Sequence, residues 1–431
     1  MANKLDQNSP GGLGELTVGV TSVTGEYYDI TETVVEISLF ESIYFPYIHG
    51  VIGVNDNSMM LSDFPFVGQE RLFITWKRDD SPFTRTFFVT KVTNATSVDG
   101  GYGAYELTLS SVVQTRNSSS LFSKAYSDRG DKILKKVFSE QLGTSLSPQE
   151  GTQSKGSHSV VFPWMKPLQA VDMVQKSILG DDGTPMMIYD VLYENEIRLD
   201  TLKRMADRGP IMTIEHFKPS NQEDDGQAFM KLADDRGMPI NDSIGRAYNT
   251  YDAINKGAFA SKMEVFDPST SRWEPMEFDY ESKAPVLGTK DWLSQQYTVN
   301  GSHPKSLFDT VNTPVMQNSR AFVDEFPGLN TTDDYDKSII RSYIQRHSTS
   351  VVKIYMDGIS YTPQSSLPFC VGQTVEYNMN RFKPDLDNGE ILDKVNSGKY
   401  IIASIRHIIQ NFEHYMSIEL VRDSVGEEAK L

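Results

Sequence analysis

Histidine side chains are the first candidates for proton transfer or metal binding, because imidazole titrates near neutral pH and is a common metal ligand. No two of the seven histidines lie four residues apart on a predicted helix, so the spacing of a helical zinc site is missing. His407 and His414 flank a predicted turn and could face each other across a hairpin. With Arg406 and Glu413 beside them, we predict a surface cross-strand pair and no metal site. The other five are scattered along the chain: His49, His158, His216, His303 and His347.

Two pairs of adjacent carboxylates could in principle supply a general acid and a general base, namely Asp224-Asp225 and Asp333-Asp334. Both lie in polar segments without the apolar surroundings that raise a carboxyl pKa, so glycosidase chemistry is not predicted. A third acidic segment, Asp385 to Gly389, is similar to the start of a calcium loop. Its glycine comes one position early and Asn396 stands where a bidentate Glu is required, so we predict a solvated turn.

Signatures of common enzymes are missing, since the chain has no His-Glu-x-x-His, Gly-x-Ser-x-Gly or Gly-x-x-x-x-Gly-Lys-Ser/Thr. The glycine-rich stretch Gly100 to Gly103 lies between two predicted strands and indicates a hairpin turn. Cys370, the single cysteine, lies in an apolar run and is predicted to be a buried small hydrophobe. Asp131, part of an Arg-Gly-Asp tripeptide, is predicted to be a helix N-cap. We predict no enzymatic activity, no catalytic, cofactor-binding or metal-binding residue, and no cofactor.

Length and charge narrow the class of protein further. The 431 residues are too many for one ordinary core and indicate about three domains at roughly 150 residues each. The formal net charge of -17 argues against binding nucleic acid through its phosphates, which requires clustered Lys and Arg. No stretch approaches the ~20 apolar residues of a membrane helix. The lone cysteine excludes an intrachain disulfide, and we expect the protein to reside in reducing, soluble surroundings.

Hydrophobic spacing predicts the elements that would position any site. Alternating residues predict strands through residues 16–112, where Tyr105, Leu107 and Leu109 share one face of a half-buried antiparallel sheet. Helical spacing then begins near residue 131 and ends at Gly143.

A second helix is predicted from Pro167, and strands follow at residues 186–193 and 197–199. Another helix over residues 336–347 leads into a second strand-rich block.

That second block repeats the first. Residues 399–425 align with residues 86–112 without a gap across 27 positions, five of which are identical. Upstream, a Val-Gly-Gln triplet precedes a strand in both copies, and we expect Gly68 and Gly372 to meet a backbone demand such as positive φ. A longer charged loop, residues 382–398, distinguishes the second copy. Because closed homo-oligomers are the rule, three such chains would present six similar modules.

Three segments resemble a known family, the baseplate hub proteins of contractile-tailed, myovirus-type bacteriophages, which are related to the hub part of type VI secretion spike proteins. They are Ile43 to Asp56, Phe162-Pro163-Trp164 and Ser397 to His407. The resemblance covers most of the chain, but the segments 281–335 and 385–393 have no counterpart in it. It implies two tube-type β-barrel domains and a trimer that forms a pseudo-six-fold ring, with the tail tube on one side and the three-fold central spike on the other.

We therefore predict a mainly β protein with α/β insertions: two related tube-type antiparallel β-barrel modules, a small α/β domain and an irregular insertion. The predicted divisions are a flexible N-terminus (1–15), the first module (16–120), the small domain (121–210), the first part of the second module (211–280), an insertion or arm (281–345), and the remainder of the second module with the C-terminal tail (346–431).

The predicted function is that of a structural baseplate hub of the virion tail, assembled in the host cytoplasm and forming part of the channel for DNA passage. The predicted partners are two further copies in a homotrimer, a central spike protein, a tail tube or tube-initiation protein, and baseplate wedge proteins. Sequence-specific nucleic-acid binding and membrane insertion are not predicted. The alternatives are a tail-associated peptidoglycan hydrolase and a receptor- or carbohydrate-binding tail protein.

Overall fold

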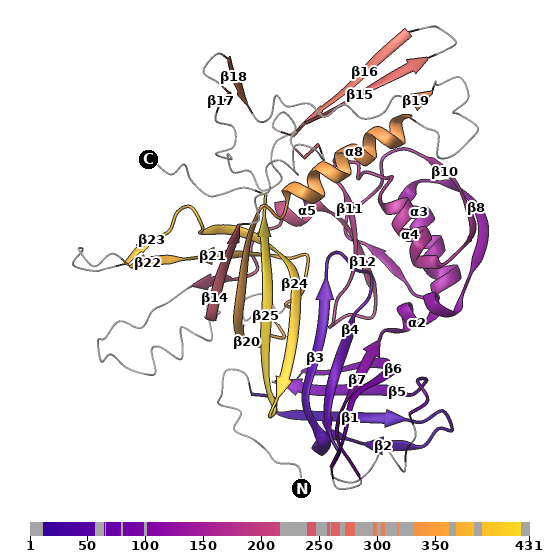
Figure 1. The fold of residues 1–431 in the computed structure, drawn as a ribbon, viewed down its shortest axis with the longest axis vertical. Coiled ribbons are helices and arrows are strands. Elements are labelled where there is room, and N and C mark those ends of the chain that lie inside the picture. The colour runs from indigo at the N-terminus through magenta and orange to yellow at the C-terminus, as the bar shows by residue number, and fades with distance from the viewer. Residues whose placement is uncertain are drawn as a thin grey trace.

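A large, mostly antiparallel sheet of 13 strands runs through the molecule and joins its two halves (Figure 1). The computed structural model describes residues 12–56, 64, 66–78, 81–98, 101–215, 239–246, 257–258, 260–267, 272–280, 296–299, 303–306, 317–318, 331–361, 368–382 and 390–423. As predicted, the chain is mainly β with few helices. The described strands form an open order, β14-β20-β25-β24-β3-β4-β7-β6-β5-β1-β2, with β21 and β13 paired beside β24.

The N-terminal half of the sheet comes from residues 15–110. Its strands alternate buried and exposed residues as predicted, and Tyr105, Leu107 and Leu109 all lie in the core. Gly101 pairs with Val98 at the end of the hairpin between β6 and β7, as expected, and Gly103 lies within β7. The elements are β1 (Glu15–Thr21), β2 (Tyr27–Asp29), a 3-10 helix (Thr31–Thr33), β3 (Val34–Ser42), β4 (His49–Asn55), β5 (Arg71–Arg78), β6 (Ser81–Val98) and β7 (Gly101–Ser110).

Residues 112–207 form helices and two small sheets beside the large one (Figure 1). As predicted, Gly143 ends the first amphipathic helix in a left-handed conformation and Pro167 begins the second. The elements are α2 (Val112–Ser119), β8 (Phe122–Asp128), α3 (Gly130–Val137), a π-helical turn (Phe138–Leu142), β9 (Leu146–Pro148), β10 (His158–Met165), α4 (Pro167–Gln175), β11 (Met186–Asp190), β12 (Ile197–Thr201) and α5 (Leu202–Asp207).

The predicted N-cap at Asp131 is wrong, because the N-cap position of α3 is Arg129 and Asp131 lies in the first turn. Its carboxylate instead accepts hydrogen bonds from the Ser154 hydroxyl at 2.8 Å and from the Ser154 backbone N–H at 3.2 Å. A carboxylate in the first turn still favours the helix through its dipole.

The C-terminal half of the sheet is assembled from strands that are far apart in the sequence. Its elements are β13 (Thr213–Glu215), β14 (Pro239–Arg246), β20 (Ser350–Asp357), β21 (Thr374–Asn378), β24 (Gly398–Gln410) and β25 (Glu413–Arg422), with the hairpin of β22 (Asn380–Phe382) and β23 (Glu390–Leu392) between β21 and β24.

Five strands occur in the same order in both halves. The run β3-β4-β7-β6-β5 corresponds to β14-β20-β25-β24-β21, and every neighbouring pair in both runs is antiparallel. Two bulges also coincide: the register shifts at Val35 in β3 and at Ile240 in β14, and at Thr90 in β6 and at Ala403 in β24. A bulge adds one residue at a defined position, so two unrelated sheets would rarely share both. The two halves therefore repeat one five-stranded arrangement.

The ungapped alignment of the two hairpins is correct on the first strand, where it equates the bulged residues. On the second strand it is wrong by two residues. Thr108 lies opposite Lys91 in β6. The alignment equates Lys91 with Ser404 and Thr108 with Val421, so it predicts that Val421 lies opposite Ser404. In the structure, Glu419 lies opposite Ser404. Since side chains alternate with a period of two, this displacement leaves the buried face unchanged.

The glycines of the two Val-Gly-Gln triplets have the positive φ that was expected, +87° at Gly68 and +78° at Gly372. The repeat ends at the next strand outward, because β1 runs antiparallel to β5 whereas β13 runs parallel to β21.

The largest difference between the halves is one connection. Residues 43–48 join β3 to β4, whereas residues 247–349 join the equivalent β14 to β20. The helix predicted over residues 336–347 begins five residues earlier. The long connection contains β15 (Ala260–Asp267), β16 (Arg272–Asp279), β17 (Gln296–Val299), β18 (His303–Ser306), β19 (Gln317–Asn318) and α8 (Thr331–Arg346).

Candidate functional site at the seam between the sheet halves

The two halves meet where β24 pairs with β3, and we call this pairing, between residues 404–410 and 36–42, the seam. β24 is long enough to have two partners along one edge. Its first residues, 398–401, pair with β21, and its later residues pair with β3. The seam therefore makes the two repeated arrangements into one continuous sheet.

A chain of three buried polar side chains crosses the seam on its inner face. His407 Nδ1 lies 3.1 Å from His414 Nε2, and His407 Nε2 lies 3.3 Å from Glu41 Oε1. Glu41 Oε2 accepts a hydrogen bond from the Leu192 backbone N–H at 2.9 Å. All three side chains are at most 1% exposed. The chain thus ties β3, β24, β25 and the segment after β11 together in the interior.

The two histidines face each other as predicted, but the prediction that they lie on the surface is wrong. The sequence carried a signal for burial: His407 alternates with Ile405 and Ile409, and all three belong to the inner face of β24. The neighbouring Arg406 and Glu413 misled the prediction, because adjacent residues on a strand point to opposite faces.

Neutral imidazoles satisfy both contacts when His414 Nε2–H donates to His407 Nδ1 and His407 Nε2–H donates to Glu41. A Glu-His-His chain has the form of a proton relay, yet none of its members reaches solvent in this structure. The observed geometry suits a structural network that fixes the seam.

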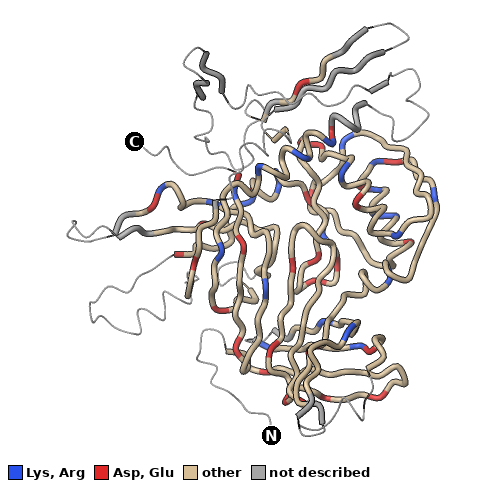
Figure 2. Tube along the Cα trace, in the orientation of Figure 1, with Lys and Arg blue, Asp and Glu red and all other residues tan. Residues whose placement is uncertain are grey.

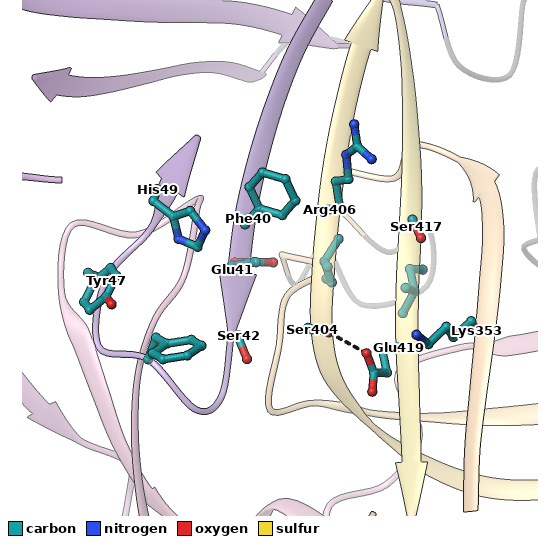
Figure 3. Close-up of a pocket in the computed structure, with 13 residues that line it drawn as sticks. Phe40, Glu41, Ser42, Tyr47, His49, Lys353, Ser404, Arg406, Ser417 and Glu419 are labelled. Atoms are coloured by element: carbon teal, nitrogen blue, oxygen red, sulfur yellow. Dashed lines mark hydrogen bonds between the residues drawn. The ribbon is translucent and has the colours of Figure 1, made fainter. Parts of the chain in front are cut away.

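An open groove of about 310 Å³ lies on the other face of the seam (Figure 3). Phe40 and His49 line its β3–β4 side, with their rings stacked at 5.1 Å. On the opposite side, Arg406 lies 5.6 Å from the Phe40 ring and donates to Glu36 at 3.0 Å. Burial lowers the pKa of His49. An aromatic wall beside charged groups is suited to contacting a side chain of a partner protein.

A second junction connects the N-terminal half of the sheet to β11. The Arg85 guanidinium donates to both oxygens of Asp190, at 2.7 and 2.6 Å, and also to the backbone carbonyls of Val191, Leu192 and Glu194. Burial raises the pKa of the Asp190 carboxyl to about 6, although Arg85 acts in the opposite direction. One arginine therefore fixes the entire turn after β11 against β6.

Cys370 lies in the core of the C-terminal half, as predicted. It is fully buried, and burial raises the pKa of its thiol to about 12. Arg198 Nη1 lies 3.4 Å from the sulfur. A protonated, enclosed thiol cannot act as a nucleophile.

The remaining candidates that fall within the described residues do not assemble into a site. Asp224-Asp225 and Asp385 to Gly389 lie outside the described residues, and Asp333-Asp334 falls in the first turn of α8. Asn396 donates to Asp393 at 2.6 Å within a turn. Among the residues that the structure describes, no group of three His, Cys, Asp or Glu side chains could hold a metal ion.

Charge and hydropathy in the described part of the chain agree with the absence of an assembled metal site there. Figure 2 shows acidic and basic residues intermingled over the sheet and the helices. None of the helices placed in the structure is both long and apolar enough to cross a membrane.

Comparisons with known proteins show which fold this is. No family model and no curated protein matches the sequence. Among solved structures, the tail protein from Neisseria meningitidis MC58 is 10% identical with a TM-score of 0.54, over 95% of this chain and 98% of that one. The 43 kDa tail protein of prophage MuSo2 from Shewanella oneidensis is 9% identical with a TM-score of 0.54, over 95% and 100%.

A component of the type VI secretion system of E. coli, described as structurally similar to T4 bacteriophage tail proteins, is 9% identical with a TM-score of 0.43, over 96% of this chain and 79% of that one. The chain has the fold of the two tail proteins.

Proposed function

We propose that this chain is the hub of a contractile-tail baseplate, a structural protein of the virion tail. The observation that supports this most is the repeated five-stranded arrangement, joined edge to edge at the seam within one chain. The fold shared with two tail proteins along nearly their whole lengths agrees with it.

The repeat would allow a trimer of this chain to match partners of two different symmetries. A homotrimer of a two-module chain presents six similar modules, so its ring can meet a six-fold tail tube on one side and a three-fold spike on the other. The proposal assigns residues 16–120 to one β-barrel module and residues 211–280 with 346–431 to the other. The small domain, residues 121–210, lies between them in sequence.

The proposed partners are a central spike protein and a tail tube or tube-initiation protein, with baseplate wedge proteins around the ring. The net charge of -17 suits a ring through which DNA passes, because a surface of the same sign as the phosphates does not retain it. We propose no catalytic role for the chain.

Solution mass and co-purification test the proposal. The full chain, with a subunit mass of 48.5 kDa, is expected to be trimeric by light scattering and to co-purify with a central spike protein from the same tail. An unrelated spike protein serves as the control. A chain that stays monomeric at all concentrations, or that releases soluble fragments from purified peptidoglycan, would contradict the hub proposal.

A further inference from the structure

The segment Phe162-Pro163-Trp164 holds one buried ring and one exposed ring. Phe162 is 0% exposed and packs against Phe122, with their ring centres 5.5 Å apart, in the core that includes α3 and α4. Trp164, two residues later, is 76% exposed, more than any other large hydrophobic side chain that the structure describes. Tryptophan is strongly buried on average in folded proteins, so an indole that projects into solvent requires an explanation.

A β-bulge in β10 gives Trp164 its exposed position. β10 pairs antiparallel with β8, and Phe162 lies opposite Lys124. If this register continued, Trp164 would lie opposite Phe122, whose side chain is buried. Instead the register shifts by one residue, and Met165 lies opposite Phe122. The extra residue therefore turns Trp164 out of the core, and bulges commonly re-aim a side chain in this way.

The backbone at Trp164 is strained. Its φ is +27°, on the positive side that glycine adopts readily and that bulky residues rarely adopt. Elements on both sides hold it there, because Phe162 is anchored in the core and Pro167 begins α4 three residues later. Strained residues cluster at functional sites, so the strain favours a role for the exposed indole outside the core of its own chain.

Two further apolar side chains share the outward side of the two-stranded sheet with Trp164. Leu121, directly before Phe122, is 60% exposed, and Val161 is 56% exposed. Figure 1 shows α3 and α4 on the inner side of β8 and β10, between these strands and the large sheet, so the outward side faces solvent. An exposed aromatic side chain with apolar neighbours is typical of a protein–protein contact.

The charges beside these side chains are positive. Residues 121–127 and 159–166 contain two lysines, Lys124 and Lys166, and no Asp or Glu, although the whole chain has a net charge of -17. Lys124 forms an ion pair with Glu140 at 2.7 Å. Lys166 is exposed and follows Met165 directly. We call Leu121, Val161, Trp164 and Lys166 the Trp164 surface. Its charge suits a partner that is acidic at the contact.

We propose that the Trp164 surface binds a protein that has an apolar pocket with Asp or Glu side chains at its rim. The indole fills the pocket, and Lys166 faces the carboxylates. Of the partners proposed for the hub, the wedge proteins lie around the ring, and the Trp164 surface faces away from the large sheet that would form it. The partner is therefore assigned as a wedge protein, and this assignment rests on the proposed function.

Trp164→Ala in the full chain tests the surface, with the purified wedge proteins of the same tail as probes in biolayer interferometry. We expect the affinity for one wedge protein to fall about 30-fold or more, as for a central Trp of an interface. The trimeric mass and the affinity for the central spike protein should not change. The urea midpoint should not fall either, because the side chain is exposed and removes no core contact when truncated.

Two further variants sharpen the test. Lys166→Glu should weaken the same complex, and its effect should shrink at high salt because the charges are then screened. The matched control is Tyr27→Ala, which removes another exposed ring, 57% exposed on β2, and should leave wedge binding unchanged.

Each other result overturns a defined statement. Unchanged wedge affinity in Trp164→Ala overturns the Trp164 surface, as does a wild-type chain that forms trimers and binds its spike but no wedge protein; both leave the hub proposal standing. Loss of the trimer or of spike binding in Trp164→Ala overturns the assignment to a wedge protein, and so does Trp164-dependent binding to vesicles of anionic lipid. A wild-type chain that neither forms trimers nor binds a spike overturns the hub itself. The two failures are thus distinguishable.

Discussion

Substituting alanine for the glycines of the two Val-Gly-Gln triplets, Gly372 and Gly68, separates the cost of a positive φ from the cost of the packing around each glycine. Both have positive φ, at +78° and +87°, and each lies shortly before a strand, β21 for Gly372 and β5 for Gly68. The surroundings differ. A Cβ at Gly372 would lie 2.6 Å from the Cζ and Oη atoms of Tyr189, whereas at Gly68 the nearest atom is the Thr90 carbonyl oxygen at 3.7 Å.

The expected costs follow from these distances. Placing a Cβ in a left-handed conformation costs about 1–2 kcal/mol, and this applies to both variants. Tyr189 is 0% exposed and packed in the core, so it cannot move away without displacing its neighbours. Overpacking of this kind costs about 1–3 kcal/mol. We expect Gly68→Ala to lose about 1–2 kcal/mol of unfolding free energy, and Gly372→Ala about 2–5 kcal/mol.

Urea unfolding followed by circular dichroism measures the difference, provided that both variants keep the denaturant dependence of the wild type. Since the φ penalty cancels between the variants, the gap of about 1–3 kcal/mol reports the contact with Tyr189 alone. Equal losses would refute the reasoning, because they would mean that Tyr189 yields freely. A smaller loss at Gly372 than at Gly68 would refute it as well.

Two further predictions concern buried titratable groups. The pKa of Asp190 is about 6 in the fold against an ordinary 3.8, so its stabilising contribution is complete below pH 3.8 and is lost as the pH rises through about 6. Relative to Asp190→Asn, the wild type should lose about 2–2.5 kcal/mol of unfolding free energy between about pH 4 and 7; a difference that stays flat over this range would contradict this. Cys370, with a pKa raised to about 12, should resist a thiol reagent at neutral pH until the protein is unfolded, and rapid labelling of the native protein would contradict its burial.

Strand alternation and helix spacing predicted most of the sheet, because these patterns arise from burial of one face and are local in sequence. The repeat was also visible locally, through residues 86–112 and 399–425. The coinciding bulges at Thr90 and Ala403, and the positive φ of Gly68 and Gly372, were then found in the structure. The same pattern located Cys370 correctly, because an apolar run of that kind is typical of a core strand.

The seam could not be predicted in this way, because it joins residues more than 360 positions apart. The surface placement of His407 and His414 failed for that reason: on a two-stranded hairpin they would be half exposed, and β3, which covers them with Glu41, is distant in sequence. β14 was located only within a range of more than fifty residues, since its eight residues are separated from β20 by the long connection.

The long connection, residues 247–349, is relevant to how one chain could fit both a six-fold and a three-fold partner. The five-stranded arrangement is the same in both halves, and the differences lie in connections: residues 247–349 in place of 43–48, and the β22–β23 hairpin in place of the short turn between β5 and β6. Connections tolerate insertions at small cost in free energy, whereas strands held in register by bulges and buried faces do not. A ring of three copies would therefore repeat its sheet six times and its long connections three times. In the proposed ring, duplication would supply the six-fold element and insertion into one copy would supply the three-fold element.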